Sequence, residues 1–174
     1  MEEFADDPPE ERRVGETLRA AEETVAVAES CTGGLVGTLL TAVPGSSDYF
    51  DRGVVTYSYD SKLETLAVPR ELLDDHGAVS EPVARAMARG VRDVAGTNWG
   101  VSTTGVAGPG GGSAETPVGT VYVGVARRGD WGTGDSGARV ARYEFDGDRG
   151  QVRERIARRA LRDLRRAVAD RDES

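Results

Sequence analysis

Lysine is almost absent from this chain. Of its 22 lysine and arginine residues, Lys62 is the one lysine and every other one is an arginine. Inside a protein a lysine can lose its proton and act as a base, whereas a guanidinium stays charged. Lys62 is therefore a candidate for a chemical task that arginine cannot perform. A lysine left by chance in an arginine-rich chain is the alternative, and composition alone does not separate the two.

Ser30 is the candidate nucleophile for such a base. It lies in Glu-Ser-Cys-Thr-Gly-Gly, residues 29–34, between a short apolar run typical of a buried strand and a predicted helix. A serine in this kind of turn presents its hydroxyl at the sheet edge, and the backbone N–H groups that follow favour an anion or an oxyanion. Thr32 and Gly33 would line the same site, Gly33 because it allows close approach to the backbone. In the alternative, Ser30 or Thr32 only caps the helix.

The segment Val-Thr-Tyr-Ser-Tyr-Asp-Ser-Lys, residues 55–62, carries both Tyr57 and Lys62. A desolvated lysine beside a serine can take the hydroxyl proton, as in Ser–Lys hydrolases. Tyr57 is a candidate to hydrogen-bond the substrate or the Ser–Lys pair, with a core aromatic as its alternative. The alternative for Lys62 is a surface lysine at a helix start, where a positive charge is unfavourable.

A glycine-rich segment, residues 103–113, follows a further predicted strand. The backbone N–H groups of such a loop can wrap a phosphate, so Gly105 and Gly108 are predicted to contact the substrate. The segment is no Walker A loop, because no Gly-Lys-Ser/Thr follows. Arg149 and Arg153, near the start of the last predicted helix, are candidates for binding an acidic group.

Two serines follow the helix-breaking pair Pro44-Gly45. Serines in this position either cap backbone groups or contact a ligand, and capping is the commoner role. Ser46 and Ser47 are nevertheless kept as candidate substrate-binding residues.

Alternating strands and helices early in the chain, and paired strands late in it, would position these residues. Helices are predicted at 11–22, 35–43, from 60 onward, up to 76, at 80–95 and at 148–170, and strands at 24–28, 51–58, 99–106, 116–126 and 139–145. This order indicates a single-domain, three-layer α/β/α sandwich with a mixed, mostly parallel sheet. Ligand sites in such sheets lie beyond the strand ends.

Length and charge narrow the class of protein. A chain of 174 residues fits one domain, expected at 11–174 behind a disordered acidic lead-in at 1–10. A net charge of -8 repels nucleic acid and anionic membranes, and the acidic, lysine-poor composition is typical of adaptation to high salt. No apolar run is long enough for a membrane helix or a secretory signal, so a cytoplasmic protein is expected.

Cysteine and histidine are too few for several kinds of site. One cysteine, Cys31, excludes an intrachain disulfide, and one histidine, His76, excludes a His-pair zinc motif. Cys31 is expected to be a small buried hydrophobe rather than a nucleophile. Neither a metal nor another cofactor is expected.

Together these segments resemble the C-terminal domain of the competence/damage-inducible CinA family. The resemblance covers nearly the whole chain after residue 11 and rests on residues 28–34, 44–58 with Lys62, 76–84, 105–113, 117–126 and 147–149. Stand-alone members of that family are nicotinamide-nucleotide amidohydrolases (NMN deamidases). The resemblance implies hydrolysis of nicotinamide mononucleotide to nicotinic acid mononucleotide and ammonia, which recycles pyridine nucleotides.

The resemblance also implies roles for individual residues. Ser30 matches the nucleophile of the family and Lys62 its base, while Tyr57 and Thr104 match positions that line the site. In the amidase mechanism that follows, the backbone N–H groups of the 30–34 turn, or Thr104, would hold the oxyanion. A homodimer is expected on the same ground.

Three other hypotheses stay open at this point. Lys62 could keep its charge and bind the substrate phosphate instead of acting as a base. The chain could be a non-catalytic nucleotide-binding or adaptor module, linked to competence or the response to DNA damage. It could also be a Ser–Lys amidase for a different small amide.

Overall fold

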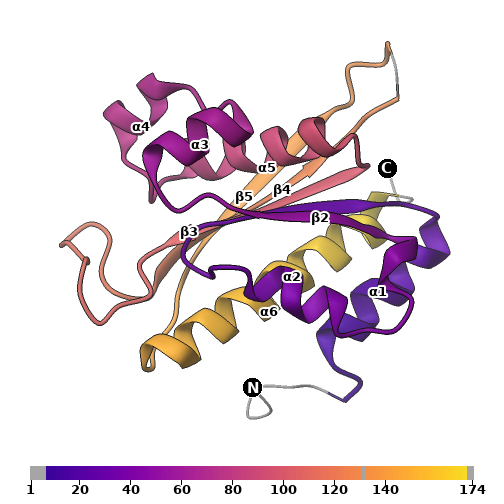
Figure 1. Ribbon diagram of the computed structural model, residues 1–174, viewed down its shortest axis with the longest axis horizontal. Coiled ribbons are helices and arrows are strands. Elements are labelled where there is room, and N and C mark those ends of the chain that lie inside the picture. Colours follow the sequence, from indigo (N-terminus) through magenta and orange to yellow (C-terminus); the bar gives the residue numbers. More distant parts are fainter. Residues whose placement is uncertain (1–6, 131, 172–174) are drawn as a thin grey trace.

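The computed structural model describes residues 7–130 and 132–171 (Figure 1). The helices are α1 (Glu10–Ala21), α2 (Leu35–Thr41), α3 (Tyr59–Leu66), α4 (Arg70–His76), α5 (Glu81–Ala95) and α6 (Arg149–Asp170). The strands are β1 (Val25–Glu29), β2 (Phe50–Val55), β3 (Trp99–Gly105), β4 (Thr120–Arg127) and β5 (Gly137–Glu144). A short 3-10 helix, η1 (Ser46–Asp48), leads from α2 into β2.

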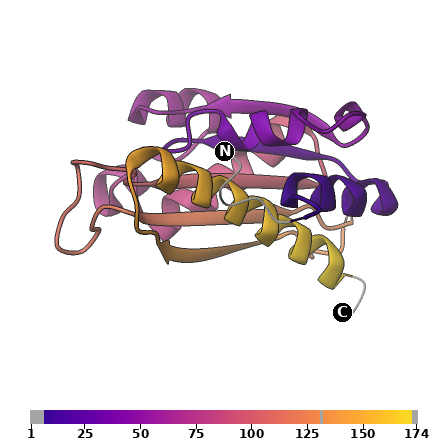
Figure 2. The same cartoon turned by 90° about the horizontal axis from the view of Figure 1, so that it is seen from below.

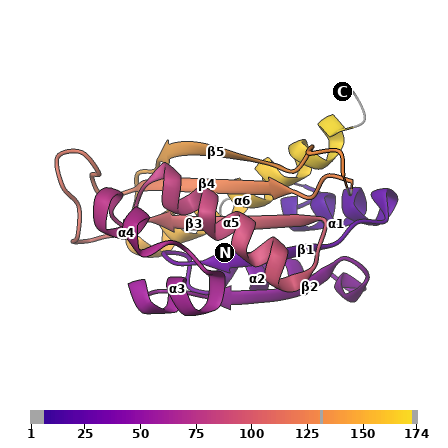
Figure 3. The same cartoon turned by 90° about the horizontal axis from the view of Figure 1, so that it is seen from above.

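The strands form one five-stranded sheet in the order β2-β1-β3-β4-β5 (Figure 3). β1 is the central parallel strand, with β2 on one side and β3 on the other. β4 runs antiparallel to both β3 and β5. The mixed, mostly parallel sheet and the pairing of the last two strands are therefore confirmed.

Helices cover both faces of the sheet, which confirms the three-layer architecture (Figures 1 and 2). Helices α1, α2 and α6 lie on one face, where α6 contacts α1, α2, β3 and β4. Helix α5 lies across all five strands on the other face and carries α3 and α4 against it. Each face has its own cluster of buried apolar side chains.

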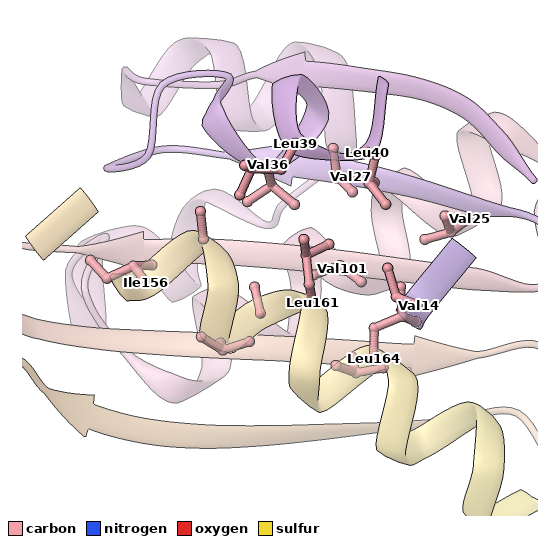
Figure 4. Packing of buried hydrophobic residues seen from close by; sticks show 14 of the residues in the cluster. Val14, Val25, Val27, Val36, Leu39, Leu40, Val101, Ile156, Leu161 and Leu164 are labelled. Atoms are coloured by element: carbon pink, nitrogen blue, oxygen red, sulfur yellow. The ribbon is translucent and has the colours of Figure 1, made fainter. Parts of the chain in front are cut away.

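The alternation of side chains along β1 explains why its sequence is apolar throughout. Val25 and Val27 join the core beneath α1, α2 and α6, whereas Ala26 and Ala28 join the core beneath α3–α5. A strand buried on both faces reads as an unbroken apolar run. Figure 4 shows Val27 among Val36, Leu39 and Leu40 of α2, and Leu161 of α6 beside Val101 of β3.

The strand predicted at 51–58 is too long at its C-terminal end, because β2 ends at Val55. Ser58 ends the extended backbone as the N-cap of α3: its side chain accepts a hydrogen bond from the Ser61 N–H, and the Ser61 side chain accepts one from the Ser58 N–H. This capping box starts the helix at Tyr59. The predicted strand at 116–126 likewise begins later, at Thr120.

The expected lead-in at 1–10 overlaps the first helix by one residue. α1 begins at Glu10, which is buried and receives a 2.6 Å hydrogen bond from the Arg165 guanidinium of α6. Residues 1–6 of that segment lie outside the described residues. Among the helices that the structure describes, none is long and apolar enough to span a membrane.

Candidate active site

Ser30 lies just beyond the carboxyl end of β1. Its N–H donates to the carbonyl oxygen of Thr103 at 2.9 Å, which extends the β1–β3 ladder by one bond. Side chains alternate along a strand, so Ser30 shares the face of Ala26 and Ala28, beneath α3–α5. Its residue surface is 9% exposed, and its hydroxyl therefore lies at the edge of the sheet with limited access.

Helix α3 brings Lys62 to this hydroxyl. Lys62 is fully buried, and its Nζ lies 3.2 Å from Ser30 Oγ. Nζ also donates to the carbonyl oxygens of Thr56 at 2.7 Å and Tyr57 at 3.4 Å. Three groups therefore hold the amine in one position, and the alternative of a surface lysine is wrong.

Burial changes the protonation of Lys62. Loss of solvation disfavours the ammonium form and lowers its pKa from 10.5 to about 8. A thiolate at Cys31 would oppose this shift, but burial raises the pKa of that thiol to about 12. Cys31 therefore stays protonated at neutral pH and is a small buried side chain, as expected. A substantial share of Lys62 is neutral near pH 8.

A buried carboxylate controls the turn that follows Ser30. Glu29 accepts hydrogen bonds from the N–H groups of Gly34, Val36 and Gly37 at 2.8 to 3.0 Å, and from Thr32 Oγ1 at 2.6 Å. These N–H groups form the first turn of α2, so the helix is capped by Glu29, a strand residue. The alternative that Ser30 or Thr32 caps the helix is wrong.

The position of Glu29 limits where an oxyanion can bind. The N–H groups at the start of α2 are taken by its carboxylate, Gly33 N–H donates to the Ser30 carbonyl, and Leu35 N–H donates to the Thr32 carbonyl. Within the described residues, only the N–H groups of Cys31 and Thr32 in this turn make no hydrogen bond to another residue. These two are the candidate oxyanion donors.

Thr32 belongs to the frame of the turn. It is fully buried, and its hydroxyl gives its proton to Glu29, so the 2.7 Å contact with Thr103 Oγ1 must be donated by Thr103. The Thr32 carbonyl accepts from both Nε and Nη2 of Arg153 on α6, at 3.2 and 2.6 Å. The Thr32 side chain is therefore engaged within the protein, and its N–H is the group left to contact a substrate. Substrate binding by Thr32 stays a prediction.

Gly33 and Gly105 serve close backbone packing. Gly33 has a φ of 60°, and a Cβ there would meet Arg153 Nη2 at 3.3 Å. A Cβ on Gly105 would meet the Thr120 carbonyl oxygen at 2.5 Å, because β3 and β4 pair there. Both glycines stand beside the site: the positive φ favours glycine at 33, and the close pairing of β3 with β4 requires it at 105.

Thr104 is one strand from Ser30 and on the same face. The pairing of Glu29 with Thr103 puts Ser30 beside Thr104. The Thr104 hydroxyl donates to the Ala78 carbonyl at 2.7 Å, in the connection between α4 and α5. Its one proton is thus already engaged, which weakens the expectation that Thr104 stabilises an oxyanion.

Arg149 joins two segments at the rim of the site. A capping box between Asp148 and Gln151 starts α6 at Arg149. Its Nη1 donates to the Gly108 carbonyl at 2.6 Å and its Nη2 to the Tyr57 hydroxyl at 3.3 Å. Tyr57 is 61% exposed, so the alternative of a core aromatic is wrong. Tyr57, Gly108 and Arg149 are thus brought together.

Ser46 and Ser47 are not brought to the site. They lie in η1, which precedes β2, whereas Ser30 follows β1. Because β1 and β2 are parallel, these positions are at opposite edges of the sheet. Within one chain the structure therefore does not bring them beside Ser30, because α2 carries the backbone back along the sheet before β2 begins. Substrate binding by Ser46 and Ser47 stays a prediction.

A hollow in the surface lies away from Ser30, toward the opposite end of β3. It lies between β4, β5 and the end of α6, and it is lined by Trp99, Arg139 and Arg171 among others. Trp99 opens β3, while Ser30 lies beside the end of that strand. The described residues contain no group of three histidine, cysteine or acidic side chains suited to a metal ion.

Sequence reasoning missed the roles of Glu29 and Thr103 in the turn, and it assigned Arg153 a different role, the binding of an acidic group. One signal was present: a carboxylate that ends an otherwise apolar strand must find donors when it is buried. Arg153, more than a hundred positions away, gives no local signal of its contact with Thr32.

Fold and site define a class: three-layer α/β proteins with a serine and a buried lysine at the carboxyl edge of the parallel strands. The family model of the CinA C-terminal domain matches residues 8–168, and the chain belongs to this family. A CinA-like protein of Anaeromyxobacter sp. (strain K) is 52% identical over 151 residues, which cover 87% of this chain and 35% of the relative. The chain thus spans about a third of the length of the curated relatives it matches.

Solved structures share the fold along nearly the whole chain. A CinA-superfamily protein from Klebsiella pneumoniae is 34% identical with a TM-score of 0.85, and the match covers 92% of this chain and 96% of that one. The competence/damage-inducible protein CihA from Agrobacterium tumefaciens is 38% identical with a TM-score of 0.84, covering 92% and 93%.

Proposed function

We propose that this chain is an amidase that hydrolyses the carboxamide of nicotinamide mononucleotide, giving nicotinic acid mononucleotide and ammonia. The observation that carries the proposal is the 3.2 Å contact between Ser30 Oγ and the buried Nζ of Lys62, whose pKa is lowered to about 8. A serine needs a neighbouring base to become a nucleophile, and a desolvated lysine is such a base.

Lys62 Nζ contacts three oxygens, to which an ammonium can donate with all three of its N–H groups and a neutral amine with two. A neutral amine has two N–H groups and one lone pair. The carbonyl oxygens of Thr56 and Tyr57 take the two N–H groups, which leaves the lone pair for the hydroxyl proton of Ser30. An ammonium would instead present a third N–H to Ser30 Oγ and could not accept its proton.

The reaction then follows in two stages. Ser30 Oγ attacks the carboxamide carbon while its proton passes to Lys62, and the N–H groups of Cys31 and Thr32 receive the oxyanion. Lys62 returns the proton to the nitrogen, the C–N bond breaks and ammonia leaves. Water deprotonated by Lys62 hydrolyses the ester on Ser30, and the serine recovers its proton.

The contacts of Lys62 argue against its rival role as a charged phosphate ligand. Its Nζ already has the carbonyl oxygens of Thr56 and Tyr57 and Ser30 Oγ as partners, which leaves no N–H group for a phosphate. Arg149 is exposed and stands at the glycine-rich loop, where its guanidinium has further N–H groups. Arg149 and the loop at 105–112 are therefore the proposed phosphate site. The homodimer and the cytoplasmic location stay predictions.

Ammonia release from nicotinamide mononucleotide, measured in molar salt with Ser30→Ala beside the wild type, tests the proposal. Release by the wild type and none by a folded Ser30→Ala is expected. Absence of release from a folded wild type would contradict it. Nucleotide binding without ammonia release would favour the adaptor hypothesis instead.

A further inference from the structure

Three hydroxyl side chains stand in a row across the parallel strands. The last register pairs join Glu29 to Val55 on β2 and to Thr103 on β3. One step further along, Ser30 therefore stands between Thr56 and Thr104. The bond from the Thr56 N–H to the Glu29 carbonyl, 2.8 Å, continues the β1–β2 ladder to this position.

Alternation places the Thr56 side chain on the face of the Ser–Lys pair. Val54, two residues earlier, joins the core beneath α3–α5, as Ala28 does for Ser30. Neighbouring strands are roughly 4.8 Å apart, so the Thr56 and Ser30 side chains are adjacent. Lys62 Nζ bonds the main chain of the same residue, Thr56, at 2.7 Å.

The two outer hydroxyls of the row differ in one respect. Thr104 Oγ1 donates to the Ala78 carbonyl, whereas Thr56 Oγ1 is buried and has no hydrogen-bond partner in the described part of the chain. The Thr56 residue is 1% exposed. A buried hydroxyl without a partner is unfavourable, and such groups in proteins are normally satisfied by a ligand or water.

We propose that Thr56 Oγ1 is the acceptor that holds the departing nitrogen of the carboxamide beside Lys62. This inference rests on the proposed amidase function. The nitrogen must face Lys62 Nζ to receive a proton from it, and Nζ is held beside Thr56 by its hydrogen bond to the Thr56 carbonyl oxygen. One carboxamide N–H then points to the free hydroxyl oxygen, while Ser30 attacks the carbon from the middle of the row.

This assignment makes Thr56 a specificity-determining residue for amides. An ester leaving group is an oxygen without an N–H, so it gives nothing to the Thr56 acceptor. Loss of the hydroxyl should therefore slow cleavage of the amide more than cleavage of the matching ester. A purely structural role would slow both substrates equally.

The test compares Thr56→Val with the wild type on nicotinamide mononucleotide and on the methyl ester of nicotinic acid mononucleotide. Valine keeps the shape and removes the hydroxyl. We expect kcat/KM for the amide to fall by about tenfold, the effect of one hydrogen bond, and that for the ester to stay within about twofold. Thr56→Ser, which keeps the hydroxyl, should keep the wild-type ratio of the two substrates.

Thr120→Val is the matched control. Thr120 Oγ1 is the other buried threonine hydroxyl without a partner in the described residues, and it lies on β4, two strands from Ser30. This variant should leave both activities unchanged. Both valine variants should melt at or above the wild-type temperature, because each removes an unsatisfied buried polar group.

The outcomes are distinguishable. Equal losses on amide and ester in Thr56→Val, or no loss on either, would overturn the role of Thr56 while the amidase proposal stands. A folded wild type that releases no ammonia would overturn the amidase proposal itself, and with it the role of Thr56, before any variant is compared.

Discussion

Lys62 Nζ lies closer to the carbonyl oxygen of Thr56, at 2.7 Å, than to the hydroxyl oxygen of Ser30, at 3.2 Å. The main chain at the end of β2 therefore orients the amine, and Ser30 meets an amine that is already fixed. Preorganisation of this kind lowers the reorganisation that proton transfer requires.

The pH dependence of turnover tests which form of Lys62 works. Since the base must be neutral and its pKa is lowered to about 8, kcat/KM should rise with pH by about tenfold per unit below 8 and level off above it. A pH–rate profile from 6 to 10 measures this. A charged phosphate ligand predicts the opposite, a decrease above pH 8.

The same pKa shift predicts a pH-dependent stability. The folded-state pKa of Lys62 is about 8 and its ordinary value is 10.5, so between these values the unfolded chain holds a proton that the folded chain lacks. The free energy of unfolding contributed by Lys62 should rise with pH across this window and be constant below it.

Urea denaturation of wild type and Lys62→Met at pH 7, 8, 9 and 10 measures this contribution. Other titrating groups act in both proteins and cancel in the difference, wild type minus variant. That difference should increase between pH 8 and 10. A difference that does not change with pH would show that burial leaves the lysine pKa unchanged.

Replacement of Lys62 by arginine separates charge from basicity. Lys62→Arg keeps a positive charge but cannot accept a proton, so turnover should be lost almost entirely while nucleotide binding is retained. Ammonia release and equilibrium binding of nicotinamide mononucleotide measure the two properties. Substantial retained activity would favour the phosphate-binding role, and lost binding in a folded variant would contradict a pure base.

Glu29→Gln should be strongly destabilising. The carboxylate accepts three N–H groups and one hydroxyl, and an amide in its place turns a donor toward one of them. We expect a loss of about 2 to 3 kcal/mol in the free energy of unfolding. Glu81→Gln is the control, because the exposed pair with Arg85 should contribute less than about 1 kcal/mol. Equal losses would contradict the capping role of Glu29.

Arg153→Lys should impair turnover more than stability. The guanidinium reaches the Thr32 carbonyl with two nitrogens, a geometry that lysine cannot reproduce. We expect kcat to fall by about tenfold, the effect of one charged hydrogen bond, through displacement of the turn. Arg70→Lys, at an exposed pair with Asp74, should change nothing. An active Arg153→Lys would show that the turn holds its shape without this contact.

The layers, and Ser30 and Lys62 as candidates, could be predicted from local patterns, because each element and each of the two residues lies in a short segment with its own signal. The apolar run before Ser30, the glycines after it and the paired late strands each carry a local signal. The edge at which Ser46 and Ser47 lie carries none, since it depends on α2 returning along the sheet. The contact between Thr32 and Arg153 has no local signal either, because Arg153 reaches Thr32 from the last helix.

The carboxylate beneath α2 has a consequence for protein design. The carboxylate that caps α2 comes from the preceding strand, so the turn that carries the nucleophile is complete only when Glu29 is included. Grafting residues 30–34 alone onto another parallel sheet would leave three amide groups uncapped and the serine misaligned. The smallest portable unit of this site therefore begins inside the strand, one residue before the nucleophile.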